Sequence, residues 1–183
     1  MKIFKKRSIA ILICVLAVIG SVLVSTHREL GRKVNEVKSQ FVDGVDHNGE
    51  SIYNDLQMSI GLAKNLTAVA KHYLPADSGD IKDVESCADD LSETIDPKKS
   101  YDLYMDLDSA VQNLNLALQK EELSDTDENY RSGIMTDFAS YSYSISHDGY
   151  NSSVRELREN VMGKFPASIL SRLAFTGRVD YFN

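Results

Sequence analysis

An uninterrupted apolar run at residues 8–26 limits what this chain can be more than any other feature, since no charged residue lies between Arg7 and His27. As an α-helix rising about 1.5 Å per residue, the run would be roughly 28 Å long, close to the ~30 Å hydrocarbon core of a bilayer. The run therefore predicts one transmembrane helix, and everything after it must function beside a membrane.

The basic residues that precede the run also fit a secretory signal peptide. Two observations favour an anchor that is not cleaved: the run exceeds the usual ~7–15 apolar residues of a signal core, and no small-x-small cleavage site follows it cleanly. Cys14 lies in the middle of the run behind Leu12 and Ile13, so it does not fit a lipoprotein cysteine. We expect an uncleaved anchor, with a cleaved signal as the alternative.

Lysine and arginine residues on the two flanks of the run bear on its orientation. Residues 1–7 carry four of them, and residues 28–38 also carry four. The first four lie within six residues directly at the membrane, which favours a cytoplasmic N-terminus. We therefore expect a single-pass protein of the cell membrane, with the bulk of the chain outside the cytoplasm.

Charge is distributed unevenly along the chain, whose formal net charge is −7. Residues 1–33 carry seven basic residues and one acidic residue, which leaves 13 basic and 26 acidic residues in the remainder. A domain this acidic repels nucleic acid and anionic lipid head groups, because binding either requires clusters of Lys and Arg. We expect no nucleic-acid partner.

Behind the anchor, apolar residues recur at intervals of three and four, the spacing of one buried helical face. The first stripe continues the anchor helix as far as Val45, after which Asn48-Gly49 predicts a bend or a break. The second stripe ends before Pro75. The residues of these two stripes are Leu30, Val34, Val37, Phe41 and Val45, then Ile52, Leu56, Ile60, Ala63, Leu66, Ala70 and Tyr73.

Two further stripes predict a short helix that Asp80 caps and Pro97 ends, and a longer helix that starts near Ser100. An acidic linker at residues 121–128 is expected to follow. The stripe residues are Ile81, Val84, Ala88, Leu91 and Ile95, then Tyr104, Leu107, Val111, Leu114 and Leu118.

The last stripe starts at Tyr130, crosses Gly149 and ends at Pro166, which predicts one helix of about ten turns. Residues 141–146 alternate with period two and would alternatively fit a strand, but no second alternating segment exists to pair with it. The stripe residues are Ile134, Phe138, Tyr141, Ile145, Val154, Leu157 and Val161.

Amphipathic helices with short connections and almost no strand signal predict an all-α fold. We expect a single N-terminal transmembrane helix followed by an antiparallel, four-helix-type bundle. The expected division is a basic tail at 1–7, the anchor at 8–26, the bundle at 27–166, and a C-terminal tail at 167–183 that ends in an aromatic pair.

The sequence contains no recognisable constellation of catalytic or metal-binding residues. Its four histidines lack the i,i+4 pairing of a helical zinc site, and its acidic groups lack the central glycine and distal glutamate of a calcium loop. There is no nucleophile elbow, Walker loop or dinucleotide-binding glycine motif. We expect a non-catalytic protein with no catalytic, cofactor-binding or metal-binding residues. If a substrate were turned over, His147 and Asp148 would be the first pair to test.

Three weaker signals remain. Cys87 stands alone in the domain and is expected to be a small buried residue, with a reactive thiol as the alternative. Asn65 and Asn151 begin tripeptides that match glycosylation acceptors, a pattern that often arises by chance. The tyrosines at positions 101–150 are expected to pack in the core and at its edge, with a ligand-stacking surface as the alternative.

Short motifs near both ends of the expected bundle are shared with a known family. Tyr150-Asn151, Val154, Val161, Phe165-Pro166 and the closing Tyr181-Phe182 form one set, and Val34-Asn35-Glu36 with Ser39-Gln40 forms the other. In these motifs, and in the anchor that precedes them, the chain resembles the LemA family of single-anchor bacterial proteins.

The resemblance covers about a fifth of the chain, and the chain also departs from the family pattern. Lys38 stands where the family has a Trp, the Ile-Pro-Asn-Leu-Val signature is missing around residues 47–62, and the path to Phe165-Pro166 is one residue longer. What the resemblance implies is a membrane-anchored, antiparallel four-helix-type bundle with no established catalytic residues.

Two kinds of function fit these expectations. The first is an interaction or scaffold module tethered at the cell envelope, which binds a protein partner or associates with itself. The second is an extracytoplasmic bundle that senses a small ligand between its helices. With one span and only seven residues before it, such a sensor would have to act through a partner protein.

Overall fold

The computed structural model describes residues 7–75, 77–164, 167–169 and 178–183. All regular structure in these ranges is helical, and none of the described residues forms a strand, so the predicted all-α class is confirmed. The chain divides into two compact units. We call Met1–Lys38 with Ser152–Val179 the anchor unit, and Ser39–Asn151 with Asp180–Asn183 the bundle unit.

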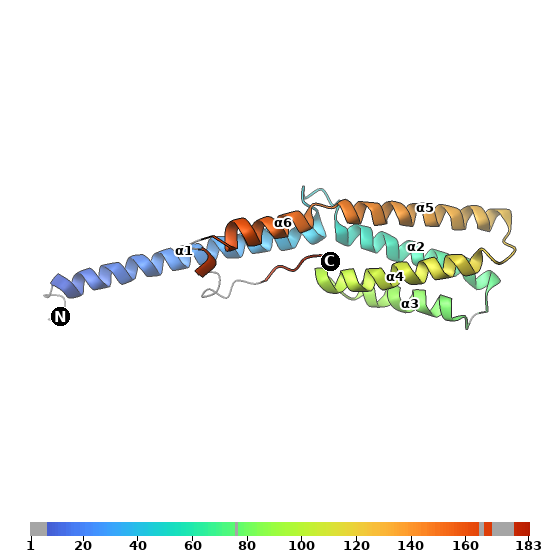
Figure 1. The fold of residues 1–183 in the computed structure, drawn as a ribbon, viewed down its shortest axis with the longest axis horizontal. Helices are drawn as coiled ribbons and strands as arrows, with labels where there is room; N and C mark the ends of the chain where they lie inside the picture. The colour runs from blue at the N-terminus through green and yellow to red at the C-terminus, as the bar shows by residue number, and fades with distance from the viewer. Residues whose placement is uncertain (1–6, 76, 165–166, 170–177) are drawn as a thin grey trace. The chain divides into compact units, whose positions relative to one another are not determined.

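Helix α1, Arg7–Asp43, is one continuous helix that contains the apolar run and continues past it (Figure 1). Large apolar side chains of the run, such as Ile11 and Leu16, are exposed, and no residue of its most apolar 18-residue window is buried. Within the described residues, α1 is the one helix that is long enough and apolar enough to cross a membrane. The predicted stripe that follows the run is buried at Leu30, Val34 and Val37.

A second helical part of the anchor unit lies along α1 (Figure 1). It consists of α6, Tyr150–Glu156, whose last five residues belong to this unit, and the π-helical segment η2, Leu157–Met162. Val154 and Leu157 are buried, as the stripe predicted. A π-helical turn holds one more residue than an α-helical turn.

Gly44 ends α1 in a left-handed conformation, with a φ of +84°. Its N–H donates to the Gln40 carbonyl over 3.0 Å, and a Cβ at this position would lie 2.2 Å from the Glu50 carbonyl oxygen. Glycine is the residue that tolerates both constraints. The predicted bend or break is thus a break, and Val45, beyond the helix end, is 36% exposed instead of extending the buried stripe.

Ser51 connects the end of α1 to the start of α2, Ile52–Tyr73. Its hydroxyl oxygen accepts the Asn54 N–H over 3.1 Å, which caps α2, and the same hydroxyl donates to the Val42 carbonyl over 2.8 Å. Ser51 is only 1% exposed, so both hydrogen bonds are shielded from water. One side chain therefore satisfies backbone groups at two helix ends.

Four helices run up and down side by side in the bundle unit (Figure 1). They are α2, α3 (Gly79–Ser92), α4 (Pro97–Leu118) and α5 (Asp125–His147). Helix α2 contacts the other three, and α3 also contacts α4. The antiparallel bundle predicted from the spacing of apolar residues is therefore present.

The core of the bundle unit is formed mainly by residues of the predicted stripes, of which Tyr73 and Tyr141 are only half-buried. Fully burying one Leu, Ile or Phe side chain contributes about 1.5–3 kcal/mol, so this set supplies most of the stabilisation. Tyr104 adds a polar contact, because its buried hydroxyl lies 2.6 Å from the Ser142 hydroxyl while its ring stacks on Phe138. The largest of the fully buried side chains on the four helices are Ile52, Leu56, Leu66, Ile81, Val84, Leu91, Leu107, Leu114, Leu118 and Phe138.

Two predicted helix boundaries near the α3–α4 connection are wrong. Helix α3 ends at Ser92, so Ile95 lies in the connection and is 68% exposed. Pro97 begins α4 instead of ending α3. Proline lacks an N–H that the first helical turn would leave unpaired, and the Asp96 carboxylate caps the turn by accepting the Lys99 N–H over 2.9 Å.

The predicted acidic linker and the predicted ten-turn helix also need correction. Asp125 begins α5, so Asp125, Asp127 and Glu128 lie in its first turn, where negative charge favours a helix start. The helix ends at His147, and Asp148-Gly149 separates it from α6. Residues 141–146 are helical, which excludes the alternative strand. The Asp148 carboxylate accepts the Tyr150 N–H over 2.7 Å and so starts the new helix.

The expected tail at 167–183 is only partly described. Residues 167–169 are helical, and residues 178–183 have no regular secondary structure. The stretch between them lies outside the described residues. The aromatic end nevertheless has a defined place in the bundle unit, since Phe182 is 5% exposed.

Candidate functional site

Five aromatic side chains from distant parts of the sequence meet in the bundle unit. We call Phe41, Tyr53, Tyr101, Tyr150 and Phe182 the Phe41 cluster. The Phe41 ring centre lies 6.3 Å from that of Tyr53, 5.5 Å from that of Tyr150 and 6.1 Å from that of Phe182. Tyr101 meets Phe182 edge to face at 5.2 Å and 90°. Tilted and edge-to-face pairs are the favourable arrangements for aromatic rings.

The closing segment, Asp180–Asn183, is held by its main chain at this cluster. The Asn151 side-chain amide makes two hydrogen bonds with Phe182: its Nδ2 donates to the Phe182 carbonyl over 2.8 Å, and its Oδ1 accepts the Phe182 N–H over 2.9 Å. The Tyr150 hydroxyl donates to the Asp180 carbonyl over 2.8 Å. Two adjacent side chains thus bind three main-chain groups of the segment.

The pattern of these bonds matches that of an extended strand bound at one edge. In an extended chain, the N–H and C=O groups of residues i and i+2 point the same way. Asp180 and Phe182 stand in that relation, and all three of their bonded groups meet Tyr150 and Asn151. The site therefore recognises main chain through Tyr150 and Asn151, and one aromatic side chain through Phe41 and Tyr101.

All residues of this site except Tyr53 carry a signal in the sequence, but no signal predicts that they meet. Tyr150-Asn151 and Tyr181-Phe182 were singled out as motifs, and Phe41 as a stripe residue. Tyr101 was placed in the tyrosine set, but no periodicity connects it to Phe182. The amide nitrogen of Asn151, in one of the glycosylation tripeptides, is engaged with the Phe182 carbonyl. Only the tertiary fold shows that these positions form one site.

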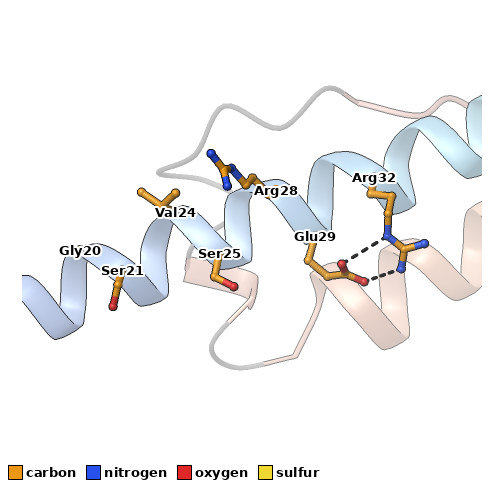
Figure 2. A pocket seen from close by; sticks show the side chains of 7 residues that line it. All are labelled: Gly20, Ser21, Val24, Ser25, Arg28, Glu29 and Arg32. Atoms are coloured by element: carbon orange, nitrogen blue, oxygen red, sulfur yellow. Dashed lines mark hydrogen bonds and ion pairs between the residues drawn. The ribbon is translucent and has the colours of Figure 1, made fainter.

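A second candidate lies on α1, where the apolar run gives way to charge. An open hollow of about 670 Å³ is lined by Gly20, Ser21, Val24, Ser25, Arg28, Glu29 and Arg32. Figure 2 shows Ser21, Ser25 and Glu29 on one side of the helix and Arg28 on the other. Arg32 donates to both Glu29 carboxylate oxygens, over 2.7 and 3.3 Å. One helix supplies every described lining residue, so the hollow is an open face and not an enclosed ligand site.

Two half-buried carboxyl groups lie near the junction of α5 and α6. Burial raises the pKa of Asp55, an effect that a hydrogen bond from Ser144 opposes and the nearby Asp148 carboxylate reinforces. Burial also raises the pKa of Asp148, against the hydrogen bond from the Tyr150 N–H. Both groups therefore hold a proton more strongly in the folded chain than in the unfolded chain.

His147 is the other residue named for a possible reaction, and its contacts are with neighbours on α5. Its ring stacks on Tyr143 at 4.0 Å, and its Nδ1 lies 2.8 Å from the Tyr143 carbonyl and 2.9 Å from the Ser146 hydroxyl. A histidine in the last turn of a helix commonly bonds a main-chain carbonyl of that turn. The structure gives His147 a role at the end of α5, and no described contact joins it to Asp148.

The remaining sequence signals take ordinary positions. Cys87 is half-buried and not fully buried as expected, and burial raises the pKa of its thiol, with Asp106, Asp83 and Asp90 adding to the shift. A raised thiol pKa lowers the thiolate fraction and therefore the reactivity.

Within the described ranges, no three His, Cys, Asp or Glu side chains lie close enough together to bind a metal ion. Tyr104 and Tyr150 are buried, whereas Tyr130 and Tyr143 are exposed.

Comparisons of the chain with protein-family models, with curated proteins and with solved structures gave no match. The site is therefore interpreted from the contacts of this chain alone, and the resemblance to the LemA family stays a prediction.

Proposed function

We propose that this protein is a membrane-anchored helical bundle that acts as a non-catalytic interaction module at the cell envelope. One observation carries the proposal: α1 is an unbroken helix whose first part exposes a complete apolar surface and whose later part is buried through Leu30, Val34 and Val37. Exposed apolar surface of this extent favours a bilayer, because its transfer from water into hydrocarbon lowers the free energy. The folded remainder is then held beside the membrane.

The bundle supports the interaction part of the proposal through what it displays. The described helices carry their apolar stripes inward and leave a strongly acidic outer surface. Such a surface favours association with basic protein segments, because complementary charge steers the encounter and raises its rate. We place this surface outside the cytoplasm, following the basic residues packed before the anchor.

Orientation is tested by labelling intact cells with a membrane-impermeant thiol reagent. The reporter is Asp125→Cys, at an exposed position that begins α5, in a chain whose Cys14 and Cys87 are replaced by Ser. Labelling without lysis is the expected result. Lys5→Cys in the same background is the matched control on the other flank and should be labelled only after lysis. The reverse pattern would place the bundle in the cytoplasm.

The interaction module itself is tested by proximity labelling from a tag fused behind Asn183, combined with sedimentation of the full chain in detergent micelles. We expect either a reproducible enriched neighbour or a defined oligomer. A strictly monomeric chain without neighbours above background would contradict the proposal. The control is the same tag fused to residues 1–38 alone, which keeps the membrane location and lacks the bundle.

A further inference from the structure

We propose that Phe41, Tyr101, Tyr150 and Asn151 form a peptide-binding site for an extended segment with one aromatic side chain, supplied by a partner protein. The closing segment Asp180–Asn183 occupies this site in the structure and shows how such a segment is held. The inference rests on the proposed interaction function, and names where the partner binds and what its chemistry is.

The main-chain half of the site is built for a peptide of unspecified sequence. Asn151 bonds both the N–H and the C=O of one residue, at 2.9 and 2.8 Å, as a neighbouring strand would. Tyr150 extends the same edge by two residues through its hydroxyl, which donates to Asp180 O over 2.8 Å. Main-chain bonds of this kind supply affinity for any extended segment, as in recognition by strand addition.

The side-chain half supplies specificity. Phe182 is 5% exposed and contacts the rings of Phe41 and Tyr101, whereas Asn183 beside it is exposed. The site therefore selects an aromatic group at one position and leaves the next position open. A buried aromatic anchor next to main-chain hydrogen bonds is the usual composition of an energetic hot spot.

Three helices supply the groups that hold the closing segment. Phe41 belongs to α1, Tyr101 to α4 and Asn151 to α6. With the segment in place, Phe41 and Tyr150 are 1% and 0% exposed, and their ring centres lie 5.5 Å apart. The acidic domain around it favours segments with basic flanks, and in this chain Arg178 precedes the closing segment.

The test measures competition between the closing segment and a free peptide on the full chain in detergent micelles. The probe is a fluorescein-labelled peptide with the sequence of residues 178–183, and the control peptide replaces its phenylalanine with alanine. Phe182→Ala in the chain removes the resident anchor. We expect this variant to bind the probe at least about tenfold more tightly than the wild-type chain does, and the control peptide at least about tenfold more weakly than the probe.

Asn151→Leu, combined with Phe182→Ala, removes the two main-chain bonds made by Asn151, leaves that of Tyr150, and should weaken binding of the probe to the level of the control peptide. Equal binding of the two peptides, or no binding to a Phe182→Ala chain whose helical circular dichroism is unchanged, would overturn the proposal. Either result leaves the labelling and sedimentation tests of the interaction module untouched, so failure of the site and failure of the proposed function are distinguishable.

A second measurement avoids any loss of folding in the Phe182→Ala chain. Asn183→Cys, at an exposed position, is labelled with a fluorophore in a chain whose Cys14 and Cys87 are replaced by Ser. Unlabelled peptide should release the closing segment and lower the fluorescence anisotropy in proportion to its concentration, and the alanine peptide should not. If two chains instead exchange their closing segments and form a dimer, the occupant is a second copy and the partner form of the proposal is overturned.

Discussion

Arg131 of the bundle needs hydrogen-bond partners for its charge, because its side chain is charged and the residue is only 8% exposed. Its guanidinium bonds both oxygens of Glu128, at 2.5 and 2.8 Å, and donates to the side-chain oxygen of Asn115, which is also 8% exposed. Burying a charge is tolerated when its donors are satisfied, and removing one partner leaves the other without one. Arg131 and Asn115 should therefore behave as a unit.

We predict that Arg131→Met lowers the free energy of unfolding by about 2 kcal/mol, since it leaves Asn115 buried without its donor. Asn115→Leu should cost a similar amount, about 2 kcal/mol, by removing an acceptor from a buried charge. The double variant should cost at least about 1 kcal/mol less than the sum of the two single changes. Urea unfolding of the full chain in detergent, followed by circular dichroism, measures all three. Additive effects would show that the pair is not coupled.

Asp148 gives a second residue-scale prediction, which concerns pH. Its pKa is raised by burial above the ordinary value of 3.8, so the folded chain binds the proton more tightly than the unfolded chain does. Stability from this group is fully present below the ordinary pKa and is lost as pH rises through the raised pKa. Asp148→Asn keeps an oxygen for the Tyr150 N–H and removes the charge, so its gain in stability over wild type should grow from acidic to neutral pH.

The measurement is the difference in free energy of unfolding between variant and wild type across that pH range. Asp137→Asn, at an exposed position on α5, is the matched control and should show a much flatter difference. A constant difference for Asp148→Asn would mean that the Asp148 carboxyl does not change its proton affinity on folding.

At the scale of elements, the turn between α1 and α2 requires glycine at position 44. A methyl group at this position would meet the Glu50 carbonyl oxygen at 2.2 Å, and the φ of +84° is unfavourable for any other L-residue. Gly44→Ala should therefore destabilise the chain by about 2 kcal/mol or more. Gly61→Ala is the control, because nothing lies within 4 Å of its added carbon in the middle of α2. That change should be neutral or stabilise by up to about 1 kcal/mol. Thermal unfolding compares the two.

Local periodicity predicted helix faces better than helix ends. The buried faces of α2 and α4 were predictable because their apolar residues repeat every three or four positions, and the same rule correctly continued α1 to Phe41. It failed at Pro97 and at Asp148-Gly149, where the deciding contacts are cap bonds made by Asp96 and Asp148. A cap depends on one side chain and one N–H, so it leaves no repeating signal along the chain.

The site around Phe182 was unpredictable for a different reason. Its parts lie more than 100 positions apart in the sequence, from Phe41 to Phe182, and each part is a short motif or a single aromatic residue. Periodicity describes one helix at a time and contains no information about which helix ends meet. Motifs drew attention to Tyr150-Asn151 and Tyr181-Phe182, but their hydrogen bonds arise from the tertiary fold.

At the scale of the whole molecule, the division of apolar surface along α1 predicts what removal of the anchor would do. Side chains from Ile11 to Val24 are exposed, and burial on this helix begins at Leu30. A chain that starts at His27 should therefore lose only surface that contributes nothing to the described cores. We expect it to leave the membrane fraction, to remain soluble without detergent and to keep cooperative thermal unfolding within a few degrees of the full chain in micelles. A chain that starts at Val42 is the matched control: it also lacks Leu30, Val34, Val37 and Phe41, so its unfolding temperature should fall sharply. Aggregation of the chain that starts at His27, or loss of its cooperative unfolding, would show that the apolar run stabilises the fold and is more than an anchor.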